Sequence, residues 1–173
     1  VLPDLAGRML GVESQGPGRI VTWTADRLRV WASTTETNLA NHTFGQRVCD
    51  AKTVGPFSWG FLPCSRGSLI YWDGGTATPP KVLGPNESGF VGIAGIDGVL
   101  RLDEKRILSW GHDGRLHIWN TEDHEIPLIL DGHFGAVSGA HVLSDHRVVS
   151  WSVDHDLRIW DGRNGELLAT LSG

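Results

Sequence analysis

Short stretches in which apolar and polar residues alternate, separated by turn residues, fill the C-terminal part of the chain. Residues 147–152 and 157–160 alternate in this way and are rich in Val, Ile and Trp, while Asp, Gly and Asn occupy the segments around them. Neighbouring residues of a strand point to opposite faces of a sheet, so alternation with a period of two indicates strands. The pattern therefore predicts an antiparallel meander of four strands, over residues 136–143, 147–152, 157–160 and 166–171.

This pattern occurs four times along the chain. The segment 106–119 returns as 147–160 at an offset of 41 residues without a gap, and fainter copies lie at 19–31 and 61–72. The third strand of each copy ends in a tryptophan: Trp31, Trp72, Trp119 and Trp160. A period of about 40–45 residues that ends in this way is typical of a propeller blade. We therefore predict one domain over 1–173 made of four contiguous blades, at approximately 3–40, 41–83, 84–131 and 132–173.

The upstream units follow the same plan with more variation. The first unit runs from about Arg8 to Leu39. In the second unit we predict strands at 47–53, 58–63, 69–72 and 81–83. In the third unit the predicted strands are 91–96, 106–110, 116–119 and 126–130. About five extra residues around 95–98 explain much of the longer spacing there, and we expect them to lengthen the first strand or its turn.

The last unit carries motif residues at fixed places: Gly132-His133 before its first strand, Ser150 in the second, Asp154 in the following turn, and Trp160-Asp161 at the end of the third. On these residues the unit resembles a WD40 repeat. The resemblance implies that His133, Asp154, Ser150 and Trp160 form a buried hydrogen-bonded network. A buried imidazole or indole N–H needs such partners, because an unpaired one costs about 1–3 kcal/mol. A carboxylate beside the imidazole also fixes its tautomer.

The resemblance covers the whole chain but weakens in the other units. The third unit keeps Ser109, Asp113 and Trp119, with Gly84-Pro85 in place of Gly-His, and the first keeps Thr22, Asp26 and Trp31. The second unit keeps Trp72-Asp73 but has Pro63 and Gly67 at the serine and aspartate positions, and His42 stands in the histidine slot. We therefore predict a complete network in the fourth blade alone.

A second tryptophan recurs one residue after the hydroxyl residue of the second strand, as Trp23, Trp110 and Trp151. Because neighbours on a strand face opposite ways, these indoles are expected to pack against the adjoining blade while the hydroxyl faces the other side. The alternative is a regular aromatic ladder for stacking sugars.

Charge and cysteine content limit the function classes. The 173 residues have a formal net charge of −5 with acids and bases interspersed, which argues against nucleic-acid binding, since phosphates need clustered Lys and Arg. No apolar run is long enough to cross a bilayer, so no membrane association is expected. Cys49 and Cys64 form no paired motif; a bridge between them is possible, but buried thiols in a cytoplasmic protein are the prediction.

No catalytic chemistry is predicted. Asp154-His155-Asp156 and Glu122-Asp123-His124-Glu125 place acids beside an imidazole, yet both lie in turns or loops without the spacing that brings metal ligands together. We interpret them as solvated turn residues. The sequence shows no glycine-rich phosphate loop and no nucleophile elbow, so we predict no enzyme, no cofactor and no metal.

The fold class is thus predicted as an all-β, WD40-type propeller of four blades per chain. Rings of this family close with about seven or eight blades, so the chain is expected to be half of an eight-bladed homodimeric ring or an excerpt of a longer propeller, with self-closure of four blades as a third possibility. The predicted function is a non-catalytic scaffold or sensor for protein or peptide partners, with Arg47, Glu87 and Phe134 as candidate partner-binding residues. The alternatives are a propeller that binds carbohydrate or another small ligand, and a structural spacer in a larger protein.

Overall fold

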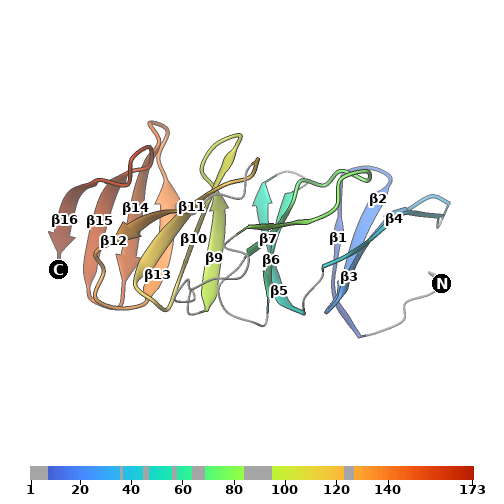
Figure 1. The fold of residues 1–173 in the computed structure, drawn as a ribbon, viewed down its shortest axis with the longest axis horizontal. Coiled ribbons are helices and arrows are strands. Elements are labelled where there is room, and N and C mark those ends of the chain that lie inside the picture. Colours follow the sequence, from blue (N-terminus) through green and yellow to red (C-terminus); the bar gives the residue numbers. More distant parts are fainter. Residues whose placement is uncertain are drawn as a thin grey trace. The chain divides into compact units, whose positions relative to one another are not determined.

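The protein forms four antiparallel sheets of four strands each in the part of the chain that the computed structural model describes (Figure 1). These residues are 8–35, 37–44, 47–55, 58–63, 69–83, 95–122 and 127–173. They contain strands and turns, and no helix among them is long and apolar enough to span a membrane. The chain divides into two compact units, each with two sheets.

The first unit holds the two N-terminal sheets. One sheet is ordered β1 (Met9–Ser14), β2 (Arg19–Thr24), β3 (Arg27–Ala32) and β4 (Thr37–Thr43). The other is ordered β5 (Val48–Gly55), β6 (Ser58–Pro63), β7 (Leu69–Trp72) and β8 (Lys81–Leu83). The strands of the second sheet lie within about two residues of the predicted ranges, whereas the first sheet continues to Thr43, past the predicted boundary at residue 40.

The second unit holds the two C-terminal sheets. One contains β9 (Ile96–Arg101), β10 (Arg106–Gly111), β11 (Arg115–Asn120) and β12 (Leu128–Asp131). The other contains β13 (Val137–Val142), β14 (Arg147–Ser152), β15 (Asp156–Asp161) and β16 (Leu167–Ser172). Each of the four sheets is a meander in which consecutive strands are paired, as expected when tight turns join the strands.

The predicted strand at 91–96 is wrong, because the first strand of the third sheet is β9, Ile96–Arg101. Gly95 has a φ of +56°, a left-handed conformation that extended backbone does not adopt, so the strand begins only after it. The residues at 91–94 lie outside the described part of the chain.

Each unit has its own apolar core between its two sheets. In the first, Trp23 and Leu28 pack with Val48, Trp59 and Trp72. The Trp59 indole N–H also donates to the Glu13 carboxylate at 2.6 Å, which joins the two sheets through a polar contact.

In the second unit, Trp110 and Leu116 of one sheet pack with Val148 and Trp160 of the next. The predicted packing of the second-strand tryptophans is confirmed for Trp23 and Trp110, which are at most 9% exposed. It is wrong for Trp151, which is 43% exposed. An aromatic ladder for sugars is also not formed by these three residues, because two of them are buried.

The prediction of buried thiols is wrong for Cys49, which is exposed and disulfide-bonded. Cys49 stands at a register shift of the β5–β6 pairing between Val48 and Asp50, and such a bulge leaves one residue outside the regular ladder. Cys64 lies outside the described residues; in sequence it follows Trp23 by 41 residues, in the place of the tryptophan that the other units share.

Candidate functional site

A buried polar network lies at one end of the fourth sheet, where the segment before β13 meets the β14–β15 turn. We call this end of a blade the turn face. His133 Nδ1 lies 2.9 Å from Asp154 Oδ2, and His133 Nε2 lies 2.8 Å from Ser150 Oγ. The Trp160 indole N–H donates to the same Ser150 Oγ at 2.9 Å. One consistent set of donors satisfies all four residues: indole N–H to serine oxygen, serine O–H to Nε2, and Nδ1–H to carboxylate. The network ties the segment before β13 to strands β14 and β15.

The Asp154 carboxylate is the most strongly held charge of this network. Burial by itself raises its pKa, but the hydrogen bond from His133 and those from the Phe134 and Asp156 amides outweigh this effect and hold the pKa well below its usual range. The two amides donate at 2.9 and 3.0 Å. Asp154 therefore stays ionised and fixes the backbone of two segments, the one before β13 at Phe134 and the start of β15 at Asp156.

Among the described residues, the other sheets contain only parts of this network. The Trp31 indole N–H donates to the Thr22 hydroxyl, and the Trp119 indole N–H donates to the Ser109 hydroxyl, each at 2.8 Å. In the second sheet Trp72 instead donates to the carbonyls of Gly75 and Thr78.

His42 lies beside Trp72 much as His133 lies beside Trp160, with ring centroids 6.4 and 6.3 Å apart. However, its buried Nε2 has no hydrogen-bond partner among the described residues. Gly84 and Pro85 of the third unit are outside those residues.

Phe134, one of the three candidate partner-binding residues, is 93% exposed. Its backbone N–H donates to Asp154, and its ring lies 5.6 Å from the guanidinium carbon of Arg158. The Arg158 side chain is itself buried, and its Nη2 is 3.4 Å from Asp156 Oδ2. The exposed ring is therefore held at its backbone by the network and supported on one face by a cation–π contact. The role of Arg158 was missed because β15 carries it like any other strand residue.

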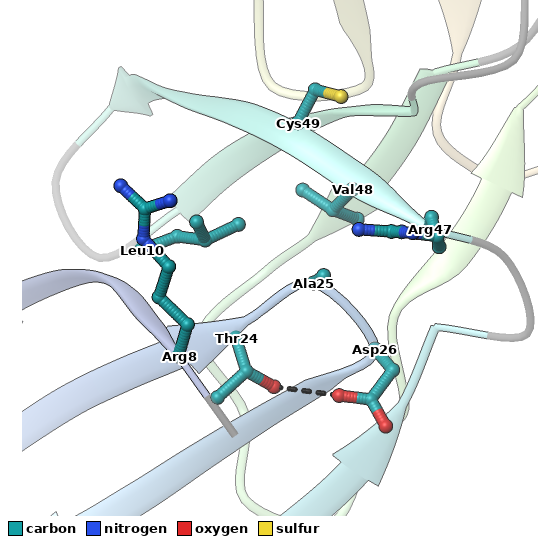
Figure 2. Close-up of a pocket in the computed structure, with 8 residues that line it drawn as sticks. All are labelled: Arg8, Leu10, Thr24, Ala25, Asp26, Arg47, Val48 and Cys49. Atoms are coloured by element: carbon teal, nitrogen blue, oxygen red, sulfur yellow. Dashed lines mark hydrogen bonds between the residues drawn. The ribbon is translucent and has the colours of Figure 1, made fainter.

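Arg47, the second candidate, lies just before β5 and lines a cavity of about 310 Å³ in the first unit (Figure 2). Three segments line this cavity: the start of β1, the β2–β3 turn and the start of β5. The lining residues are Arg8, Leu10, Thr24, Ala25, Asp26, Arg47, Val48 and Cys49. Sequence reasoning selected Arg47 but missed Arg8, since nothing local links residues 39 positions apart. The third candidate, Glu87, lies outside the described residues.

The two acidic segments weighed as metal sites have other contacts. Asp154 belongs to the buried network, and Glu122 pairs with Lys105 at 2.9 Å. Residues 123–125 are outside the described part of the chain. Within that part, no group of three or more His, Cys, Asp or Glu side chains is placed to hold a metal ion.

Four-stranded antiparallel meanders that repeat every 41 to 47 residues, with a tryptophan closing each third strand, define blades of a β-propeller. The crystal structure of the WD40 β-propeller domain of Doa1 is similar, with a TM-score of 0.57 and 17% sequence identity over 90% of this chain and 51% of that one. The chain therefore has the WD40 β-propeller fold and spans about half the length of that domain.

A scan against protein-family models finds no match, and neither does a search of curated proteins. Propellers of the WD40 type generally serve as protein-interaction scaffolds and are usually non-catalytic.

Proposed function

We propose that this chain is a non-catalytic scaffold that binds peptide segments of partner proteins through the turn face of its blades. The observation that carries this proposal is Phe134, whose ring is exposed to solvent while its backbone N–H is bonded to Asp154 of the buried network. Exposed aromatic side chains give large contact area at a small entropic cost, and they dominate the binding energy of many interfaces. The buried network beneath the ring lowers that cost further, because the backbone of Phe134 is already fixed in the free protein.

Selection from a phage-displayed library of 12-residue peptides tests this function. We expect the wild-type chain to enrich peptides, among them a group whose binding Phe134→Ala weakens about tenfold or more, measured by fluorescence anisotropy. Leu168→Ala is the matched control, since it also removes an exposed apolar side chain but lies on β16. Failure to enrich any peptide, or equal binding of every selected peptide by Phe134→Ala, would contradict the proposal.

We further propose that a second copy of the chain completes the ring. The outer face of the β13–β16 sheet supports this, since Trp151 and Leu171 are 43% and 57% exposed. The residues in the same positions of the preceding sheet, Trp110 and Leu130, are 9% and 0% exposed because the fourth sheet covers them. An apolar face of this kind is built to receive another blade. A closed twofold assembly would cover it, and the chain's length, about half of the similar propeller domain, fits two copies per ring.

Leu171→Asp is expected to break this assembly. In light scattering across a dilution series, the wild-type chain should have a mass near twice 18.8 kDa, and the variant should have the monomer mass, because a carboxylate would be buried in the apolar contact. Thr170→Asp adds the same charge at the neighbouring position, whose side chain faces the other side of the strand, and should remain dimeric. A monomeric wild-type chain, or a dimeric Leu171→Asp variant, would exclude this interface and favour blades of a longer chain as the cover.

A further inference from the structure

The cavity at the start of β5 contains two arginines that have no partner among the described residues. Arg8 and Arg47 enter it from opposite sides (Figure 2), and neither makes a hydrogen bond or an ion pair with another described residue. Among the described lining residues, the acid is Asp26. Its carboxylate accepts a hydrogen bond from the Thr24 hydroxyl at 2.8 Å and lies 3.7 Å from the Arg27 guanidinium outside the lining. Asp26 is thus engaged within its own turn, and the cavity keeps an excess of positive charge.

The protein as a whole has a net charge of −5, and several of its arginines are paired with an acid. Arg106, Arg115 and Arg147 each have a guanidinium nitrogen within 3.0 Å of an aspartate oxygen. Guanidinium groups in a concave site favour an anionic ligand when, as among the residues described here, no carboxylate of the chain is paired with them.

The walls of the cavity are held in place by the backbone. The Val48 N–H donates to the carbonyl of Ala25 at 2.7 Å, and the Phe44 N–H donates to the carbonyl of Asp26 at 3.0 Å. These bonds attach the segment that carries Arg47 to the β2–β3 turn, so the site exists before a ligand arrives.

Apolar side chains complete the lining. Val48 is buried at the base, and Leu10 lies exposed on the β1 side. The ligand that fits this lining therefore combines negative charge with an aliphatic group.

We infer that this cavity binds an acidic segment of a partner peptide, with carboxylates on Arg8 and Arg47 and an aliphatic side chain against Leu10 and Val48. The inference rests on the proposed scaffold function and specifies the chemistry of one contact. Guanidinium groups match carboxylates in planar, paired hydrogen bonds. A cavity of about 310 Å³ has room for a few side chains rather than a folded domain. A long polyanion is disfavoured, because the net charge of the protein repels it.

The experiment repeats the peptide-library selection on wild-type protein and on the Arg8→Gln/Arg47→Gln variant. We expect the wild-type selection to enrich Asp or Glu next to Leu, Ile or Val, and the variant to lose this enrichment. For the best acidic peptide, measured by fluorescence anisotropy, each single Arg→Gln change should weaken binding about tenfold, and so should replacing the acids of the peptide by amides. Arg163→Gln, which removes an exposed charge in the β15–β16 turn of the other unit, should bind as the wild type does.

Several results would overturn the inference. One is enrichment of peptides without acids; another is unchanged affinity in both arginine variants. Tighter Arg8- and Arg47-dependent binding of a labelled 12-nucleotide oligothymidylate than of the acidic peptide would assign the cavity to phosphate instead. If peptides are enriched whose binding depends on Phe134 but not on the arginines, this inference fails while the scaffold function stands. If no peptide is enriched at all, both fail.

Discussion

Asp154→Ala is expected to lower the free energy of unfolding by about 2–4 kcal/mol, one of the two largest effects of a single substitution that we predict for this chain. The change leaves three donors without their acceptor: the His133 imidazole N–H and the amides of Phe134 and Asp156. The His133 side chain is fully buried, so water cannot replace the carboxylate there. Urea unfolding followed by tryptophan fluorescence measures the effect at pH 7.

The contribution of Asp154 should also depend on pH. Its pKa in the folded chain lies below the value of 3.8 that it has when unfolded, so the unfolded state takes up the proton first as the pH falls. The stabilisation is therefore fully present above pH 3.8 and is lost progressively below it, as the pH falls toward the folded-state pKa.

Asp154→Asn is the matched control for both effects. The amide oxygen can still accept a hydrogen bond from His133, so the loss at pH 7 should be smaller than for alanine, but the variant has no titrating group at this position. The stability difference between wild type and Asp154→Asn should shrink when the pH is lowered from 5 to 3. An equal difference at both values, or an alanine variant as stable as the wild type, would contradict the role assigned to this carboxylate.

Gly98→Ala is expected to cost about 2–3 kcal/mol of unfolding free energy. Gly98 lies directly opposite Trp110 on the neighbouring strand, and a methyl group at Gly98 would overlap the six-membered ring of that indole. Trp110 is packed in the core of the second unit and is only 9% exposed. The indole or the backbone must therefore shift against close-packed neighbours.

Gly139→Ala is a nearly identical change with a different expected result. Gly139 faces Trp151 across β13 and β14 in the same way, and a methyl group would meet the same ring atoms. Because Trp151 is 43% exposed, the indole can swing outward, and the cost should stay below about 1 kcal/mol.

Urea unfolding of both alanine variants is best compared in the Leu171→Asp background, in which the proposed second copy does not cover Trp151. Equal losses for the two variants would show that coverage by the next sheet does not decide the cost. In the wild-type background, Gly139→Ala should in addition weaken the dimer, because a displaced Trp151 changes the shape of its contact face.

The polar sites differ in how far the sequence predicts them. The residues of the His133 network stand at motif positions within 28 residues of one another, so a local pattern identifies them. The arginine cavity combines Arg8 with Arg47, and only the packing of β1 and the β2–β3 turn against the start of β5 brings these side chains to one cavity. No repeat or periodicity of the sequence predicts that Arg8 and Arg47 line one cavity, which explains why Arg47 was selected without Arg8.

The sequence by itself determined most of the strands, their grouping into four sheets, and the faces on which the tryptophans lie, because a period of two and a repeat of 41 residues are local properties of the chain. Tertiary structure decided which of those faces are covered. Trp110 and Trp151 lie at the same position of their second strands, each opposite a glycine of the first strand. One is buried and the other exposed, because only Trp110 has a further sheet packed over it. It likewise decided that Cys49 stands at a bulge in a disulfide and that Arg8 and Arg47 share a cavity, because contacts between distant segments depend on how sheets pack and not on the order of residues within any one of them.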